Sequence, residues 1–528
     1  MKKMVSELKE NRILLLIILI SVMLSIFYGF QKEGLFLDEL YSYGLSNSHY
    51  APFVENIKGG NFIDTVITKE ELSNYITVTE GEGFNYGSVY YNQSQDVHPP
   101  LFYMLLHTVC SFFPGIFSKW FGLGLNIMIY AATLIMLYKT SELIFKNKKV
   151  SLTIVFLYGI SNAGLSTANM IRMYMLLTFF TVLLAYFILK FLQQKNWQSC
   201  LAIGLTIFFG LFTQYYFVFY AFFVCAGVVI YLLCKKDIKN AAFFGISAVL
   251  GVALMYLCYP VCIDHLFADK VVSGGSAVSN LTNLSIYAER IRHFTSDLVD
   301  SVIAAVRISI LLAVVILFTR KKKGISCEEK EIRTKALLLF VPAIFTHFLA
   351  AIISPYLIIR YIYNIIPMLM LLPAYLIYRM LNVKNNDSRW LFGTAGVIAL
   401  LSVVALIAQG PTWLYREYIA YDEIMEKQEG KICVYMTQNA DYGVVSDLPQ
   451  LLNFDEIFVT DDIDSETLYE YMEKQDKNKG VVVYIAEGLE LGDTTHDDIL
   501  NEFIEKYGYN DYTLLFNGKD FSMTYLVE

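Results

Sequence analysis

Two groups of ionisable residues border one polar segment of a chain that is otherwise rich in apolar runs. Asp38 and Glu39 follow the first apolar run, and Asp96-Val97-His98-Pro99-Pro100-Leu101 closes the polar segment that begins there. Ionisable residues held against a bilayer are costly, so they are candidates for function. The pattern indicates a carboxylate-based active site at the boundary between membrane and water.

The Asp38-Glu39 pair has two interpretations. Neighbouring residues on a helix point about 100° apart, so the two carboxylates cannot do the same job. In the catalytic interpretation one abstracts a proton, which contributes about 10²–10⁴-fold to the rate, and the other orients it or contacts a sugar. In the structural interpretation both are first-turn acids, which a helix N-terminus favours. Spacing alone leaves both open.

The second cluster holds a histidine in front of two prolines. A residue before proline avoids the α region, so His98 is expected to be extended at the start of a helix. A histidine fixed in this way can donate to a phosphate or hold a carboxylate. The alternative is a turn and helix cap that leaves His98 exposed.

The elements that must position these residues are membrane spans. Of the 528 residues, 56% are hydrophobic and only 17% are charged, whereas a soluble chain carries about 25% charged residues. The mean hydropathy is +0.47. Apolar runs long enough to cross a hydrocarbon core of about 30 Å predict about eleven spans. They lie near 12–30, 116–138, 150–166, 173–190, 198–213, 216–234, 241–262, 301–319, 336–353, 361–379 and 390–409.

The net charge of −8 is distributed unevenly between the connections. With the N-terminus in the cytoplasm, alternate connections collect lysine and arginine, among them Lys146, Lys195, Lys235 and the run Arg320–Lys323. The opposite connections hold few basic residues, and the loop 31–97 is acidic. This positive-inside pattern predicts a cytoplasmic N-terminus and an outer C-terminus.

Two parts are expected along the chain. Residues 1–410 form a membrane domain with outer loops 31–115 and 263–300, and residues 411–528 form a small extracytoplasmic domain. The segment 98–113 is apolar but short, so a helix lying in the interface is expected there. In the C-terminal part, β-rich runs alternate with helical patterns, which predicts an α/β domain with a largely parallel sheet. The runs are 431–437, 455–460 and 481–487, and the helical patterns lie near 464–475 and 497–507.

Four motifs together resemble the GT-C superfamily of membrane glycosyltransferases. They are the Asp38-Glu39 pair, Asp96–Leu101, NAGLSTANMIRMYML (162–176) and SPYLIIRYIYNIIPMLMLLP (354–373), in this order over roughly residues 10–410. The likeness is greatest to the protein O-mannosyltransferase group, the bacterial family 39 enzymes and aminoarabinose-transferase-like enzymes. Phe102-Tyr103-Met104 stands where the mannosyltransferase motif usually has a basic residue, which favours the bacterial branch.

The resemblance implies a fold and an activity. The fold would be a polytopic α-helical GT-C membrane domain, and the activity an inverting transfer of sugar from a polyprenyl-phosphate carrier to an acceptor hydroxyl. It implies that Asp38 is the catalytic base and Glu39 its companion acid, with Asp96 and His98 in the facing motif. Arg172 and Arg360 would grip the lipid phosphate, in motifs that also contain Tyr174 and Tyr361.

Charge chemistry agrees with these roles for the arginines. A departing phosphate monoester, with a second pKa of about 6, needs charge stabilisation, which guanidinium forks supply. Arginines on the outer side oppose the positive-inside bias, although each could also extend to the interface as a packing residue. Lys270, Arg290, Arg292 and His293 are weaker candidates, because a solvated amphipathic helix explains them equally well.

Other patterns carry less weight. Asp461, Asp462 and Asp464 resemble a metal-binding loop, but such clusters after a strand are usually turns, and His265 and His347 have no partner at ligand spacing. No cofactor and no metal ligand is therefore assigned, without excluding a divalent ion. Two rival functions stay open: a transporter or lipid flippase, and a GT-C-like ligase using a lipid diphosphate donor. No internal repeat supports the transporter.

The expected location is the plasma membrane, with several spans and with the active site on the outer side. The expected partners are a polyprenyl-phosphate-linked sugar, membrane lipids and an acceptor that is a protein, a wall polymer or a glycolipid. Nothing in the sequence indicates nucleic acid binding.

Overall fold

The structure is a computed structural model that describes residues 2–60, 62–267, 279–319, 326–383, 388–438, 440–486, 495–518 and 522–528. Lys270 and the run Arg320–Lys323 lie outside the described residues. The chain divides into two compact units. The helical unit comprises Met1–Phe30, Val97–Phe102 and Gly122–Thr412, and the sheet unit comprises Gln31–Asp96, Tyr103–Phe121 and Trp413–Glu528.

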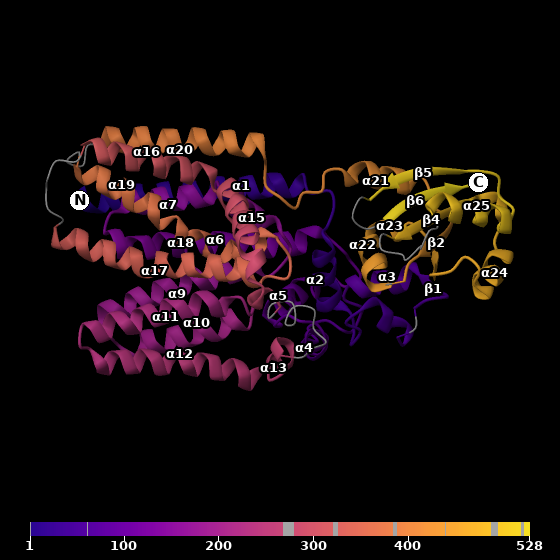
Figure 1. The fold of residues 1–528 in the computed structure, drawn as a ribbon, viewed down its shortest axis with the longest axis horizontal. Helices are drawn as coiled ribbons and strands as arrows, with labels where there is room; N and C mark the ends of the chain where they lie inside the picture. Colours follow the sequence, from indigo (N-terminus) through magenta and orange to yellow (C-terminus); the bar gives the residue numbers. More distant parts are fainter. Residues whose placement is uncertain are drawn as a thin grey trace. The chain divides into compact units, whose positions relative to one another are not determined.

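Long apolar helices make up the helical unit and run alongside one another in Figure 1. The helices of this unit, long and short, are α1 (Lys2–Phe30), α6 (Lys119–Phe145), α7 (Lys148–Gly159), α8 (Asn162–Asn169), α9 (Tyr174–Gln194), α10 (Trp197–Leu211), α11 (Phe217–Cys234), α12 (Ile238–Cys258), α13 (Cys262–Phe267), η2 (Leu284–Ile286), α15 (Tyr287–Ser301), α16 (Ile303–Thr319), α17 (Cys327–Ile353), η3 (Ile359–Ile365), α18 (Ile366–Leu369), α19 (Leu371–Val383) and α20 (Ser388–Ala408).

These helices are those of a multi-pass membrane protein. In the described residues seven are long and apolar enough to cross a membrane, or up to nine if each of two bent pairs is one span. The bent pairs are α7 with α8, at 57°, and Leu284–Ser301 with Ile303–Ile316, at 88°. The expected spans 198–213 and 390–409 contain the shorter apolar helices Trp197–Leu211 and Ala399–Ala408. Every span expected from the sequence thus coincides with a helix, a bent pair or a shorter apolar helix.

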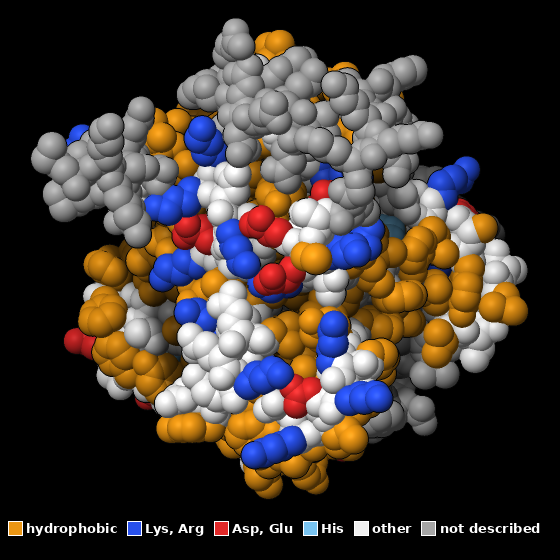
Figure 2. Space-filling view, turned by 90° about the vertical axis from the view of Figure 1, so that its left-hand side faces the viewer, with side chains coloured by type: hydrophobic (Ala, Val, Ile, Leu, Met, Phe, Trp, Pro, Cys, Tyr) orange, Lys and Arg blue, Asp and Glu red, His pale blue; other side chains and the backbone are white. Residues whose placement is uncertain are grey.

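One end of the helical unit carries the basic connections. Lys195 at the end of α9 pairs with Asp237 in front of α12, and Lys146 after α6 pairs with Glu331 of α17, with Nζ to Oε1 at 3.5 Å. Figure 2 looks onto this end and shows basic side chains distributed over it among fewer acidic ones. The described connections around Lys146, Lys195 and Lys235, which were expected to be cytoplasmic, therefore share one end (Figure 1).

The sheet unit begins with the polar segment after α1. Its elements from the N-terminal half are α2 (Leu37–Asn47), η1 (Val54–Lys58), β1 (Thr65–Thr68), α3 (Lys69–Ile76) and α4 (Tyr86–Gln95), followed by α5 (Leu101–Cys110), which starts in the helical unit. The expected short apolar helix at 98–113 is α5. The C-terminal elements are α21 (Tyr418–Glu426), β2 (Ile432–Met436), α22 (Ala440–Ser446), α23 (Leu448–Leu451), β3 (Glu456–Thr460), α24 (Glu466–Glu473), η4 (Lys477–Lys479), β4 (Val481–Ala486), α25 (His496–Tyr507), β5 (Tyr512–Asn517) and β6 (Ser522–Val527).

The sheet has six strands in the order β1-β3-β2-β4-β6-β5. Only the central pairs, β2 with β3 and β2 with β4, are parallel, and the other three pairs are antiparallel. The expectation of a largely parallel sheet is therefore wrong at both edges. The sequence runs for β2, β3 and β4 were recognised because these strands are buried on both faces, whereas β5 is half exposed and carries a weaker pattern.

Strand β1 comes from the loop between the first two spans. It pairs antiparallel with β3, with Val66 opposite Phe458. As a result, residues 31–96 and 103–121 belong to the same compact unit as the C-terminal part, although the sequence analysis placed them with the membrane domain. One face of the sheet packs on α24 and α25, with Leu468 and Phe503 fully buried.

Candidate functional site

Arg172 lies in a short break between two helices. Helix α8 ends at Asn169 and α9 begins at Tyr174, and the Arg172 backbone N–H donates to the Met170 carbonyl at 2.7 Å. Asn126 of α6 also donates to that carbonyl. At this bend in the backbone the Arg172 side chain lies in the protein interior, and the residue is only 3% exposed. A buried guanidinium needs hydrogen-bond acceptors or a negatively charged partner, since burying a charge alone is costly.

His98 lies against Arg172. The arginine Nη2 is 3.4 Å from His98 Nε2, and because a guanidinium only donates, this contact requires Nε2 to be unprotonated. His98 stands in the stretch between α4 and α5, and the start of α5 is fixed by a bond from the Leu101 N–H to the Phe212 carbonyl at 3.1 Å. The structure thus brings together residues of two of the four motifs.

Arg360 lies in η3, the short 3-10 helix that follows α17. Its side chain is 5% exposed, and the guanidinium carbon is 5.4 Å from the centre of the Tyr361 ring. Tyr361 in turn stacks on Tyr216 with ring centres 4.9 Å apart and planes inclined by 25°. A cation over an aromatic face is stabilised electrostatically, and the stack holds that face in place.

Arg172 and Arg360 occupy the same end of the helical unit. Helix α9 runs from the Arg172 break to the basic end at Lys195, and α17 runs from the basic end to Ile353 just before η3. Helix α9 also packs against η3, and the Tyr174 ring meets the Tyr363 ring edge to face at 6.4 Å. Tyr174 is 1% exposed, so it packs between the segment that contains Arg172 and the segment that contains Arg360.

Asp38 and Glu39 begin α2 in the sheet unit, and their surroundings differ as their angular offset predicts. Asp38 is half-buried, whereas Glu39 is fully buried. Glu39 Oε2 accepts from Lys32 Nζ at 2.8 Å and from the Phe36 backbone N–H at 2.8 Å. The latter bond caps the N-terminus of α2.

Lys32 was not identified from the sequence. It is fully buried, donates to the Trp413 carbonyl as well as to Glu39, and lies 5.5 Å from the centre of the Tyr415 ring. Burial lowers the pKa of the Lys32 ammonium, and the neighbouring Glu39 carboxylate opposes that shift. One signal could have indicated it: Lys32 follows the first span on the predicted outer side, where basic residues are rare.

Asp96 ends α4 in the sheet unit. Its backbone N–H donates to the Asn92 carbonyl at 3.2 Å and the residue is half-buried. Asp38, Glu39 and Asp96 therefore belong to the sheet unit, while His98, Arg172, Tyr174, Arg360 and Tyr361 belong to the helical unit.

Several weaker candidates have structural partners. Arg290 of α15 donates through Nε to the Ala351 carbonyl at 2.9 Å and through Nη2 to the Ser354 carbonyl, so it caps the end of α17. His265 bonds to the Tyr215 hydroxyl at 2.9 Å and His347 to Thr295 at 3.1 Å.

The aspartates at 461–464 form a turn. The Asp464 backbone N–H donates to Asp462 Oδ1 at 2.8 Å, and the Asp464 carboxylate pairs with Lys506 at 2.5 Å. Within the described residues no group of three or more His, Cys, Asp and Glu side chains is arranged to hold a metal ion.

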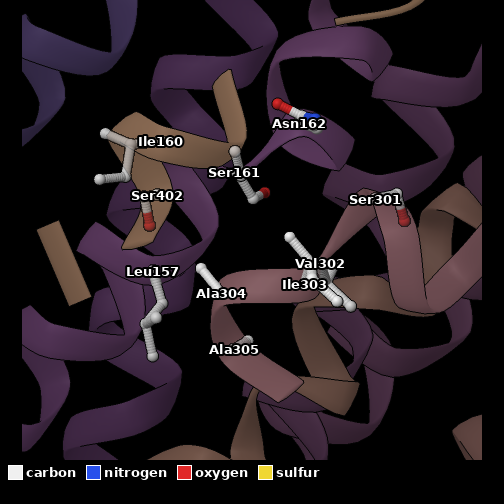
Figure 3. A pocket seen from close by; sticks show the side chains of 11 residues that line it. Leu157, Ile160, Ser161, Asn162, Ser301, Val302, Ile303, Ala304, Ala305 and Ser402 are labelled. Carbon is white, nitrogen blue, oxygen red and sulfur yellow. The ribbon is translucent and has the colours of Figure 1, made fainter. Parts of the chain in front are cut away.

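A small cavity lies where the two bent helix pairs meet (Figure 3). Ser161 and Asn162 come from the α7–α8 bend, Ser301 and Val302 from the α15–α16 bend, and Ser402 from α20. Its volume of about 10 Å³ is that of about one water molecule. In the described part of the chain, Asn162 Oδ1 and Ser402 Oγ have no hydrogen-bond partner. The cavity therefore suits a water and is too small for a sugar.

No protein-family model matches this chain, and no curated protein sequence matches it. Two solved structures have a similar fold. ArnT from Cupriavidus metallidurans bound to undecaprenyl phosphate matches with a TM-score of 0.53 at 10% identity, over 97% of this chain and 97% of that chain. The same protein in the apo state matches with a TM-score of 0.52 at 10% identity, over 100% and 98%. The chain therefore has the GT-C fold that its motifs predicted.

Proposed function

We propose that this GT-C chain is an inverting glycosyltransferase that moves a sugar from a polyprenyl-phosphate carrier to an acceptor hydroxyl on the outer side of the membrane. Polyprenyl phosphate and its sugar-charged form would be its lipid partners. The acceptor belongs to the cell envelope, as a protein, a wall polymer or a glycolipid.

One observation carries the proposal. Two buried arginines occupy the same end of the helical unit, away from the basic connections, each beside a ring that fixes it: Arg172 beside His98, and Arg360 beside Tyr361. Buried guanidinium groups held in this way are suited to a phosphate. A similar fold, that of ArnT, holds undecaprenyl phosphate, which is the ligand that such a pair would bind.

The two arginines would stabilise the leaving phosphate. As the sugar departs, a second negative charge develops on the carrier phosphate, and preorganised donors stabilise that charge more than they stabilise the intact donor. Arg172 and Arg360 supply this stabilisation without a general acid. His98 acts as a positioning residue, because its ring lies against the Arg172 guanidinium.

Asp38 would be the general base. Its carboxylate is half-buried in the first turn of α2, a position where a helix N-terminus favours a negative charge. It takes the proton of the acceptor hydroxyl as the oxygen attacks the anomeric carbon in line with the departing phosphate. The new glycosidic bond then has the opposite anomeric configuration.

We assign a different role to Glu39. The Glu39 carboxylate is fully buried and accepts hydrogen bonds from Lys32 and from the Phe36 N–H. These bonds stabilise the start of α2. Glu39 is therefore a positioning residue for Asp38, and not a second acid in contact with substrate.

A deletion strain tests the function. Mass spectrometry of its envelope glycans and glycoproteins should reveal one glycosylated product that is missing and that returns with the wild-type gene. The Asp38→Asn variant should insert normally and leave that product absent, with activity lowered by about 10²–10⁴-fold. Near wild-type product formation by Asp38→Asn would contradict the base assignment.

The carrier is tested separately. In membranes of the complemented strain, undecaprenyl phosphate should inhibit transfer as the product of the donor, and undecaprenyl diphosphate should inhibit less. Stronger inhibition by the diphosphate would favour the ligase alternative. Substrate movement across the membrane without any new glycosidic bond would favour a transporter.

A further inference from the structure

The sheet unit contains a pocket that the proposed mechanism does not use. Its volume is about 240 Å³, a little below the range of about 300–1,000 Å³ that is typical of drug-sized ligands. Three distant segments line it: residues 33–35 after α1, residues 117–119 at the start of α6, and the α21 to α23 region. A pocket of this size suits one small ring.

Two hydrogen-bonding side chains on the α21 to α23 wall are already oriented. Gln450 is 2% exposed and donates through Nε2 to Asp422 Oδ1 at 2.6 Å. This bond fixes the amide, and Gln450 Oε1 has no hydrogen-bond partner among the described residues. A buried acceptor without a donor is costly, so the wall of the pocket holds an acceptor that a ligand hydroxyl would satisfy.

Charged groups of both signs complete the lining. Glu33 is held by its backbone N–H, which donates to the Leu414 carbonyl at 2.8 Å, and Lys119 donates through Nζ to the Lys32 carbonyl. Burial raises the pKa of the Asp422 carboxyl; Glu426 and Glu33 raise it further, while the bond from Gln450 and the charge of Lys119 lower it. The pocket thus offers carboxylate and amide acceptors next to an ammonium donor.

This mixture matches a hydroxyl-rich ligand. Each hydroxyl both donates and accepts, so a polyol can use the carboxylates and the ammonium together. A cationic ligand is less suited, because Lys119 already supplies a positive charge beside the acids. Tyr418 and Phe117 add apolar surface on which the C–H face of a sugar ring can pack.

We infer that this pocket binds one neutral sugar ring, and that the ring belongs to the acceptor onto which the new sugar is transferred. The acceptor role rests on the proposed function, whereas the binding of a saccharide does not. The pocket selects its ligand through Asp422, Gln450 and Glu33, which are distinct from Asp38 and from the two arginines.

The experiment measures glycoside binding to the full chain in lipid nanodiscs, because glycoside detergents would compete. Saturation-transfer NMR would be recorded with methyl glycosides of glucose, galactose and N-acetylglucosamine, and with ethanolamine as a small cation. At least one glycoside should bind to the wild type. Asp422→Asn and Glu33→Gln should each weaken that binding about tenfold or more. Glu423→Gln, one residue along α21 and exposed to solvent, is the matched control and should bind as the wild type does.

The outcomes separate the two proposals. The inference is overturned if no glycoside binds to the wild type, if ethanolamine binds in place of glycosides, or if both pocket variants bind as tightly as the control. Thermal melting identifies any variant that misfolds. If Asp422→Asn does not fold, the Glu33→Gln variant alone tests the inference. Glycoside binding that persists in Asp38→Asn supports the pocket. If the deletion strain has an unchanged glycan profile while the purified protein still binds glycosides, the proposed function is wrong and the saccharide-binding pocket is supported.

Discussion

At the scale of single residues, the adjacent acids Asp38 and Glu39 have different surroundings. Asp38 keeps part of its surface exposed, while Glu39 is fully buried against Lys32. The sequence predicted that the two carboxylates would differ in their task, whereas the contacts that bury Glu39 and its partner Lys32 involve the distant Trp413–Tyr415 segment.

The buried ion pair gives a stability prediction. Glu39→Gln leaves the Lys32 ammonium buried without its counter-charge, which should cost about 3–5 kcal/mol in the free energy of unfolding. The melting temperature of the purified protein measures this loss. The double variant Lys32→Met with Glu39→Leu removes both charges and should recover most of the stability. A single variant as stable as the wild type would show that the pair is not buried.

The two arginines give a kinetic prediction. Arg172→Lys and Arg360→Lys retain the charge but lose the planar fork. Each should lower kcat by about tenfold or more, because the lost bonds are strongest to the departing phosphate. Arg292→Lys, an exposed position on α15, should leave kcat unchanged. Equal kcat values for all three variants would contradict the role of Arg172 and Arg360 in stabilising the leaving phosphate.

At the scale of elements, one buried acid connects three parts of the sheet unit. Asp447, in front of α23, accepts from Tyr435 of β2 at 2.8 Å, from Ser522 of β6 at 2.6 Å and from Tyr421 of α21 at 3.5 Å. These three partners are neutral hydroxyls. Burial therefore raises the pKa of Asp447 from 3.8 to about 6.

This raised pKa makes the sheet unit more stable in acid. The folded state holds the Asp447 proton more tightly than the unfolded state does, so the contribution is complete below pH 3.8 and is lost as the pH rises through about 6. Its size is about 3 kcal/mol. Melting temperatures of the full chain between pH 4 and 7.5 should fall more steeply for the wild type than for Asp447→Asn. Identical slopes would contradict the assignment.

At the scale of the whole molecule, the division into a helical and a sheet unit does not follow the order of the chain. The sheet unit combines two N-terminal segments with the C-terminal part. The pairing of β1 with β3 and the bond from the Glu33 N–H to the Leu414 carbonyl are among the contacts that connect the first segment to the C-terminal part. The helical unit separates its basic connections from the buried Arg172 and Arg360 (Figure 1), which is the polarity that an outer active site requires.

The predicted orientation can be tested with cysteines. Cys234 and Cys327 are exposed on the basic end of the helical unit, and Tyr91 is exposed in the sheet unit. In a background with the other cysteines replaced by serine, a membrane-impermeant maleimide applied to intact cells should label Tyr91→Cys. It should leave Cys234 and Cys327 unlabelled until the cells are permeabilised. The reverse pattern would place Asp38 in the cytoplasm and exclude the proposed function.

The sequence by itself determined the spans, the strands β2 to β4 and a change of character near residue 410, but not that residues 31–96 and 103–121 belong with the C-terminal part. Apolar runs of membrane length and doubly buried strands depend on local composition, which a single sequence displays. Tertiary structure decided which residues pair. The Arg172–His98 contact and the addition of β1 to β3 join positions that lie far apart in the chain, and Lys32, which pairs with the nearby Glu39, also contacts the distant Trp413 and Tyr415. It also decided that Arg290 caps a helix, since its partners are backbone carbonyls of α17 and its C-cap, which no residue pattern reveals.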